Sequence, residues 1–200
     1  LLITSPLTAP HMLERLGTLL VRGADLLVVA DNIGNVEQLA EVAAAKNSVL
    51  PVVVELDVGV GRTGCRDVPT ALAVARAIAA QPSLSFAGVQ AYWGHLQLVT
   101  PFAERRLRVE REAARLRELI AALQASGLPP SRVTGGGTGT HHIDAGLGLF
   151  TELQVGSFLF LDSLYGATEL EPGGNPYRPS LFVAASVVSA DGPESSGWTT

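Results

Sequence analysis

Short apolar, β-branched runs alternate with helix-forming stretches along most of this chain. The runs with strand character lie at residues 1–4, 26–30, 52–56, 86–92, 132–134 and 152–155. The stretches with helical character lie at residues 10–21, 35–45, 68–80 and 101–125. Strands that alternate with helices form βα units, whose strands pair in parallel because each helix carries the chain back across the sheet. The sequence therefore predicts an α/β protein with a parallel sheet, which is either an open doubly wound sheet or a barrel.

Polar and glycine-rich residues follow the C-terminal end of nearly every predicted strand. These segments are residues 31–32, 57–62, 92–97, 135–140 and 156–157. Such a distribution favours a barrel, whose active-site face is built from the loops that follow its strands. About six strands do not close an eight-stranded barrel, so we expect residues 1–170 to form an incomplete TIM-type (β/α)8 barrel that lacks its N-terminal part.

The pattern changes after the turn-forming sequence at residues 173–176. Residues 181–188 form a long β-branched run that ends in Asp191-Gly192-Pro193 without a following helix. We interpret this run as the first strand of a separate C-terminal β domain, at residues 178–200, which the sequence cuts short.

Composition narrows the classes of function. With 200 residues and 47% hydrophobic content, the chain can bury one sizeable core. The net charge is −5 and no basic stripe with interleaved aromatic residues occurs, which argues against a nucleic-acid partner. No apolar run approaches the ~20 residues that span a bilayer, so no membrane partner is expected. Cys65 is the single cysteine; we expect it to fill apolar space, and its isolation favours a reducing, cytoplasmic compartment.

The sequence Val133-Thr134-Gly135-Gly136-Gly137-Thr138-Gly139-Thr140 is the most distinctive local motif. Successive glycines let several N–H groups turn to one side, and such a nest binds anions. The motif is neither a dinucleotide fingerprint nor a nucleotide P-loop, which would end in Lys-Ser/Thr. A second segment of small residues, Gly156-Ser157, follows the next strand. Together they predict a phosphate site of the β/α-barrel type; a flexible linker or a tight turn is the simpler alternative.

Two further loops carry groups that could contact a flat, anionic ligand. Arg62 lies in a glycine-rich loop and offers a fork of donors to a phosphate, carboxylate or phenolate. Pairing with Asp57 is its structural alternative. Tyr92 and His95 leave the fourth strand and could stack on a ring, or they could pack beneath a loop. The adjacent His141 and His142 point in different directions on a regular element, so we do not expect them to bind one metal ion.

Three segments, residues 53–64, 88–97 and 134–162, together resemble the D-threonine aldolase and D-serine dehydratase-like family. Its members are pyridoxal-phosphate enzymes of the alanine racemase fold type. The most specific part is the GGGTGT run with residues 151–157 and 162–166. The resemblance implies a β/α barrel followed by a β domain, with pyridoxal 5'-phosphate at the C-terminal mouth of the barrel. It also implies a divalent metal in the full-length parent and a site completed across a homodimer.

The resemblance assigns cofactor-binding roles to ten residues. Those that would hold the phosphate are Gly135, Gly136, Gly137, Thr138, Gly156 and Ser157. Arg62 would approach the phenolic oxygen of the ring, and Tyr92 would contact the ring with His95 just beyond. Gln154 stands where racemases of this fold keep an arginine near the pyridine nitrogen. A neutral amide would tune the ring differently, which argues against racemase activity.

The chain departs from the family in its lysine content. Lys46 is the only lysine, and it lies between the second helix and the third strand, on the rim opposite the glycine loops. The resemblance places the Schiff-base lysine on a first barrel strand and the metal ligands in the C-terminal domain, and this sequence includes neither. We therefore expect a fragment of a pyridoxal-phosphate-dependent lyase, inactive alone, whose parent cleaves D-β-hydroxy-amino acids as D-threonine aldolase does. A D-serine dehydratase-type lyase, a non-catalytic cofactor-binding remnant and a scaffold without ligand are the alternatives.

Overall fold

The strands form one parallel sheet whose spatial order follows the chain. The computed structural model describes residues 1–186. Its strands are β1 (Leu2–Ile3), β2 (Leu27–Ala30), β3 (Leu50–Glu55), β4 (Leu84–Ala91), β5 (Arg132–Gly135) and β6 (Glu152–Leu153). Each pairs in parallel with its neighbours in the order β1-β2-β3-β4-β5-β6. A doubly wound sheet reverses its strand order, so this sequential order is that of a half-barrel, as the strand-end pattern predicted.

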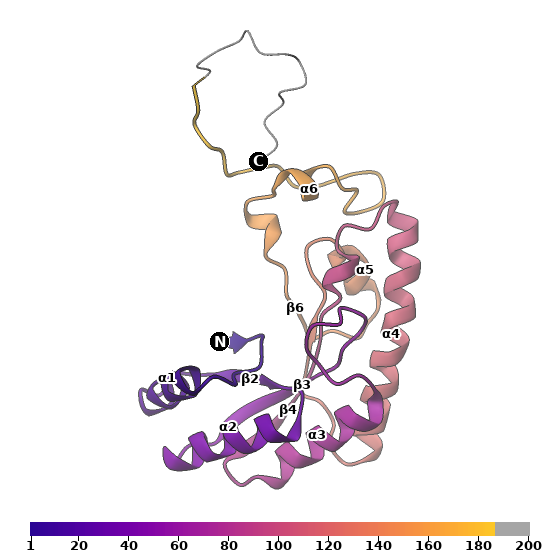
Figure 1. Ribbon diagram of the computed structural model, residues 1–200. Coiled ribbons are helices and arrows are strands. Elements are labelled where there is room, and N and C mark those ends of the chain that lie inside the picture. The colour runs from indigo at the N-terminus through magenta and orange to yellow at the C-terminus, as the bar shows by residue number, and fades with distance from the viewer. Residues whose placement is uncertain (187–200) are drawn as a thin grey trace.

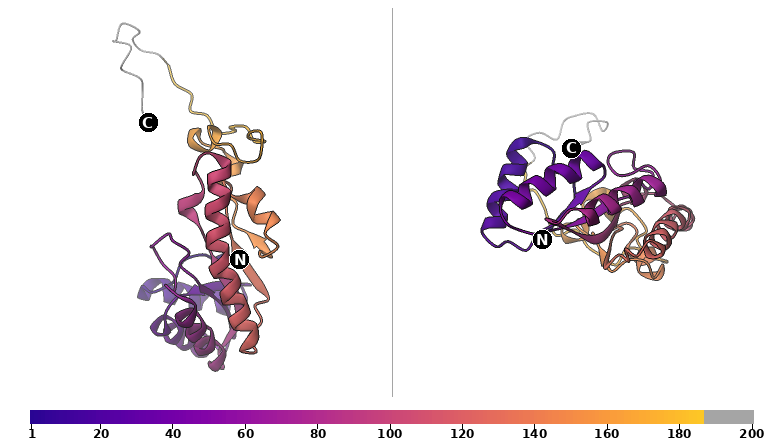
Figure 2. Two further views of the ribbon diagram at one scale, coloured as in Figure 1. Left: turned by 90° about the vertical axis from the view of Figure 1, so that its right-hand side faces the viewer. Right: turned by 90° about the horizontal axis from the view of Figure 1, so that it is seen from below.

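Four long helices lie around the outside of the sheet. They are α1 (Pro10–Val21), α2 (Ile33–Ala45), α3 (Val68–Ala80) and α4 (Phe102–Ala125), and they follow one another in an arc (Figure 1). Figure 2 shows α4 running along most of the length of the molecule. The short elements η1 (Gly94–Leu96), α5 (His141–Gly146), η2 (Ser157–Leu159) and α6 (Ser163–Gly166) were not expected from the sequence. Among the described residues, no helix has both the length and the apolarity needed to cross a membrane.

Side-chain caps set where two of the helices begin. The Asn32 side chain accepts a hydrogen bond from the Asn35 N–H at 2.8 Å, and α2 therefore begins two residues before the predicted start. The Asp67 carboxylate accepts from the Thr70 N–H at 2.7 Å and begins α3. Each cap satisfies one of the N–H groups that the first turn of a helix leaves without a partner.

The central strands β2 and β3 are buried on both faces, as expected for strands of a barrel. Val52 and Val54 belong to the large core between the sheet and the helices. Val53, on the opposite face of β3, packs with Leu27 and Val29 in a smaller cluster on the inner side of the sheet. Side chains alternate between the two faces of a strand, so unbroken apolar runs are buried on both.

The expected strand at residues 181–188 is not observed where the structure describes the chain. Residues 181–186 have no regular secondary structure, and residues 187–200 lie outside the described residues. A strand requires a hydrogen-bonded neighbour, and no described strand lies beside residues 181–186. The division into a barrel part at 1–170 and a β domain at 178–200 stays a prediction.

Candidate functional site

A cavity of about 530 Å³ lies between the two edge strands of the half-barrel. It brings together Arg62, Tyr92 and Gln154, which follow β3, β4 and β6 and which the sequence had singled out. The other lining residues are Leu2, Thr4, Ser5, Gln90, Glu152, Leu153 and Val155. The parallel arrangement places the C-terminal ends of these strands at one edge, so three loops far apart in sequence meet there.

The Arg62 side chain is directed toward Tyr92. Its guanidinium carbon lies 5.9 Å from the centroid of the Tyr92 ring, within the range of a cation–π contact. Asp57, the alternative partner, instead accepts hydrogen bonds from the N–H groups of Gly59 and Gly61, both at 3.0 Å. Arg62 therefore brings its positive charge to the cavity, while Asp57 closes its own loop.

A chain of side-chain hydrogen bonds crosses the floor of the cavity. Gln154 Nε2 donates to Gln90 Oε1 at 3.0 Å, and Gln90 Nε2 donates to Glu55 Oε1 at 3.0 Å and to the Thr4 carbonyl at 2.9 Å. Glu55 is buried, and desolvation raises the pKa of its carboxyl despite the hydrogen bond from Gln90. This network ties β1, β3, β4 and β6 together. Of these residues only Gln154 was singled out from the sequence, because Gln90 alone reads as an ordinary strand position.

Close backbone packing accounts for two glycines of the 133–140 motif. A Cβ on Gly135 would lie 1.9 Å from the carbonyl oxygen of Ala91, and a Cβ on Gly139 would lie 1.8 Å from that of Gln97. Gly136 has a φ of +64°, a region that side chains other than glycine rarely adopt. The flexible-linker alternative is therefore wrong: this segment is tightly packed against β4 and the turn that follows it.

Two buried side chains hold the glycine loop from below. Gln97 Oε1 accepts the Gly139 N–H at 2.7 Å. The Asp144 carboxylate accepts the Gly137 N–H at 3.3 Å and the Thr140 hydroxyl at 2.6 Å on one oxygen, and the Trp93 indole N–H at 3.1 Å on the other. Burial raises the pKa of Asp144 to about 6, although all three hydrogen bonds act in the opposite direction. Part of the predicted anion nest is thus already used within the protein.

The remaining donors lie where the glycine loop meets the loop after β6. Among the described residues, the backbone N–H groups of Gly136, Thr138, Gly156 and Ser157 have no hydrogen-bond acceptor. The hydroxyl of the buried Thr138 accepts the Phe158 N–H at 3.2 Å and so joins the two loops. The two predicted phosphate segments are therefore adjacent, with backbone donors left over for an anion.

The histidines lie outside the group of residues that lines the cavity. His95 is exposed, and its Nε2 approaches to 3.0 Å the position a Cβ on Gly59 would take. His141 Nδ1 lies 2.8 Å from the Thr138 carbonyl, and His142 Nδ1 lies 3.7 Å from a carboxylate oxygen of Glu171. The side chain of His95 faces the Gly59 loop and does not line the cavity. Its ring-contacting role stays a prediction.

Tyr165 is a further candidate for a ligand-contacting residue, which no pattern in the sequence singled out by itself. It lies in α6, whose first turn is capped by the Asp162 side chain through the N–H groups of Leu164 and Tyr165. Burial raises the pKa of the Tyr165 phenol, and the Ser157 side chain opposes this while the nearby Tyr92 adds to it. The signal available from sequence was the run 162–166, which carried part of the family resemblance.

Lys46 lies away from the cavity, as its position in the sequence indicated. It caps the C-terminal end of α2, and its Cε is 3.0 Å from where a Cβ on Gly17 of α1 would lie. The lysine therefore packs in the outer layer of helices, and its amine does not line the cavity.

Known proteins are similar to this chain in both sequence and fold. It is 39% identical over 193 residues to a D-threonine aldolase of Arthrobacter sp, and 34% identical over 192 residues to a 3-hydroxy-D-aspartate aldolase of Paracoccus denitrificans. These alignments cover 96% and 94% of this chain but 50% of each relative, so the chain spans about half their length.

The solved structures agree with this relationship. The D-threonine aldolase of Filomicrobium marinum superposes with a TM-score of 0.79 at 35% identity, over 82% of this chain and 44% of that one. The D-threo-3-hydroxyaspartate dehydratase of Delftia sp. HT23 gives 0.71 at 28% identity, over 78% and 42%. The family model described as "Alanine racemase, N-terminal domain" matches residues 4–164. With more than half of its residues matched and the half-barrel in place, the chain belongs to the alanine racemase N-terminal domain family.

Proposed function

We propose that this chain is the cofactor-binding part of a pyridoxal-phosphate-dependent lyase that acts on D-β-hydroxy-amino acids. The reaction assigned to the whole protein is retro-aldol cleavage to glycine and an aldehyde. The aldolases named above are 34–39% identical to the chain, whereas the curated D-threo-3-hydroxyaspartate dehydratase of Delftia sp. is 31% identical over 157 residues. The order of identities favours cleavage over dehydration.

The observation that carries the proposal is the convergence of Arg62, Tyr92 and Gln154 on one cavity. Their groups suit a flat, phosphorylated pyridine: a cation for the phenolate, an aromatic face for the ring, and an amide for the ring nitrogen. The N–H groups of Gly136, Thr138, Gly156 and Ser157 are the donors available for the phosphate. When bound, pyridoxal phosphate supplies an electron sink for the bond-breaking step.

The protein's own contribution is to bind the cofactor and to orient it. The buried Asp144 and Gln97 fix the glycine loop, which would hold its N–H groups ready for an anion without further ordering. The amide network of Gln154 and Gln90 similarly fixes the polar floor. A site with such fixed dipoles reorganises little when charge develops on a ligand.

Other features of the whole protein belong to the same proposal. These are a divalent metal, a homodimer, a β domain from residue 178, and a cytoplasmic location suggested by the single cysteine. The proposal also places the metal ligands and the Schiff-base lysine outside this chain. A D-serine dehydratase-type lyase is the second candidate, because the Delftia dehydratase shares the fold at 28% identity. A non-catalytic cofactor-binding remnant is the third, because Lys46 lies outside the cavity.

Equilibrium dialysis of pyridoxal phosphate against this chain tests the proposal directly. We expect saturable binding that weakens about 10- to 100-fold in Arg62→Met, the loss expected for one charge-assisted hydrogen bond. Arg66→Met is the matched control, since Arg66 is exposed and does not line the cavity. Absence of saturable binding, or equal weakening in both variants, would contradict the proposal. In the whole protein, release of glycine from D-threonine would separate the aldolase from the dehydratase, which releases ammonia and a keto acid.

A further inference from the structure

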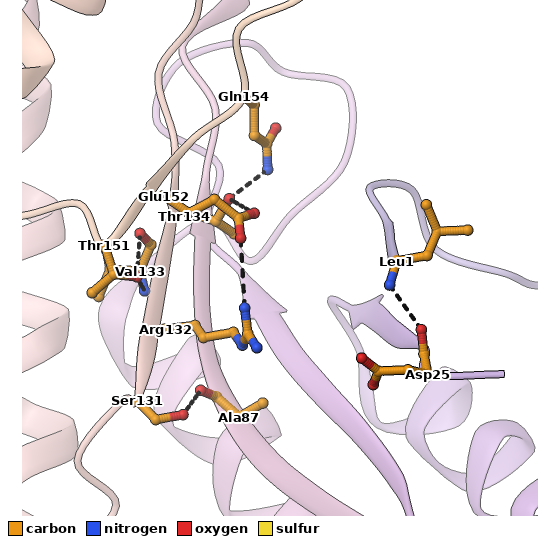
Figure 3. A network of polar contacts seen from close by, with 10 residues as sticks. All are labelled: Leu1, Asp25, Ala87, Ser131, Arg132, Val133, Thr134, Thr151, Glu152 and Gln154. Carbon is orange, nitrogen blue, oxygen red and sulfur yellow. Dashed lines mark hydrogen bonds and ion pairs between the residues drawn. The ribbon is translucent and has the colours of Figure 1, made fainter. Parts of the chain in front are cut away.

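The side-chain amide of Gln154 is held in a single orientation. Its nitrogen donates to Gln90 Oε1 at 3.0 Å and to Thr134 Oγ1 at 3.1 Å, so both of its protons are used. Its carbonyl oxygen has no hydrogen-bond partner among the described residues, and Gln154 lines the cavity. Figure 3 shows the nitrogen directed at the Thr134 hydroxyl and the oxygen directed away from it.

The first anchor of this orientation is a backbone carbonyl. Gln90 lies between Gln154 and the Thr4 carbonyl, which has no proton and can only accept a hydrogen bond. The Gln90 nitrogen must therefore face Thr4, where it also reaches Glu55 Oε1. The Gln90 oxygen is then left to face Gln154 and can be satisfied only by a donor. Reversing Gln154 would place two carbonyl oxygens against each other.

The second anchor is independent of the first and lies on β5 and β6. The Thr134 hydroxyl donates its only proton to Glu152 Oε1 at 3.1 Å, which leaves its lone pairs to accept from Gln154. Glu152 in turn forms an ion pair with Arg132, whose guanidinium lies 3.5 Å from its carboxylate (Figure 3). The Gln90 oxygen and the Thr134 hydroxyl are held by different partners, and each needs a donor. Both therefore require the Gln154 nitrogen to face them.

We propose that Gln154 presents a hydrogen-bond acceptor to the cavity and thereby selects a ligand whose facing atom carries a proton. This inference rests on the proposed function, in which the Gln154 amide meets the ring nitrogen of pyridoxal phosphate; the selected form is then the protonated pyridine. A ring nitrogen without its proton would set its lone pair against the Gln154 oxygen, and the network prevents Gln154 from turning to offer its N–H. Gln154 is therefore a specificity-determining residue. A protonated ring withdraws electrons more strongly, which suits cleavage of a carbon–carbon bond.

The orientation can be tested without ligand, by proton NMR of side-chain amides in this chain. Gln154→Met identifies the Gln154 signals, and Gln124→Met identifies those of Gln124, an exposed glutamine on α4 that serves as the matched control. We expect the Gln154 amide protons to exchange with water roughly tenfold more slowly than those of Gln124, because both are hydrogen-bonded. Equal exchange rates would show that the nitrogen faces the cavity, and the inference would be wrong.

The selection is tested with pyridoxal phosphate labelled with ¹⁵N in the ring. We expect the bound ring nitrogen to resonate as a protonated pyridine at a pH where the free ring is neutral, and to lose this signature in Gln154→Met and Gln154→Arg. A bound signal of the unprotonated kind in the native chain would overturn the inference while supporting the proposed function. If no bound signal appeared, the proposed function and the selection of the ring form would both fail. Slow amide exchange would then still establish the orientation of Gln154.

Discussion

The Asp144 carboxyl beneath the glycine loop makes the stability of this chain depend on pH in an unusual direction. Asp144 is buried at 1% exposure and accepts hydrogen bonds from Trp93, Thr140 and Gly137. Desolvation outweighs these bonds and raises its pKa from the ordinary value of 3.8 to about 6. Asp144→Asn removes the titrating group while retaining a side chain of nearly the same shape.

The sign of the effect follows from proton linkage. Between pH 3.8 and about 6 the folded chain holds the Asp144 proton and the unfolded chain has released it. The folded state therefore binds more protons in this window, and the free energy of unfolding falls as the pH rises. At about 1.4 kcal/mol for each pH unit between the two pKa values, the contribution of Asp144 falls by roughly 3 kcal/mol from pH 4 to pH 7.

Urea unfolding at several pH values between 4 and 7.5 measures this contribution. We expect the free energy of unfolding of the native chain, minus that of Asp144→Asn, to fall by roughly 3 kcal/mol across the window. Subtracting the free energy of the variant cancels the contribution of the other carboxyl groups. One of these is Glu55, whose pKa is also raised by burial. Asp25→Asn, at an exposed position, is the control for removing one carboxylate from the chain. A constant difference for Asp144→Asn would refute the argument.

Three further predictions test the packing of single residues. Gly139→Ala should destabilise the chain by about 1–3 kcal/mol, because its Cβ would collide with the Gln97 carbonyl, whereas Gly146→Ala meets no atom within 4 Å; equal unfolding midpoints for both would contradict this. Cys65 is 2% exposed, and burial raises its thiol pKa to about 12, so a thiol reagent at pH 8 should label it only after unfolding; rapid labelling of the native chain would show otherwise. Asn32→Ala should cost about 1 kcal/mol through loss of the α2 cap, and an unchanged urea midpoint would exclude that role.

The fold could be predicted because its determinants are local. Alternating apolar runs and helical stretches gave all six strands and the four long helices, with errors only at their ends. The boundaries differ where a cap or a pairing partner decides them: α2 begins at Ile33 because Asn32 caps it, and β4 begins at Leu84 because Leu84 pairs with Leu50 of β3. A strand at residues 181–186 was not found, since β character alone supplies no partner.

The site could be predicted only where the loops themselves carry the signal. Arg62, Tyr92 and Gln154 follow strands of one parallel sheet, so their convergence on one cavity follows from topology. The residues that hold the site in place could not be predicted, because they lie far away in sequence. Gln90 is 64 residues from Gln154, and Gln97 is 42 residues from Gly139. A buried amide that orients another amide has no periodicity and no spacing in the sequence, and only the three-dimensional structure reveals it.

The glycine motif shows why an anion nest cannot be inferred from glycines alone. Gly135 and Gly139 are required because a side chain at either position would strike a backbone carbonyl, and Gly136 is required by its positive φ. Gly137 differs, since its Cβ would meet the side-chain amide of Gln97 at 2.5 Å rather than a backbone atom. Movement of Gln97 would release the Gly139 N–H that its oxygen accepts, so bulk at Gly137 acts on the loop through Gln97 as well as through any bound anion. A loss of phosphate binding on enlarging Gly137 therefore identifies a binding loop only if the Gln97–Gly139 hydrogen bond persists.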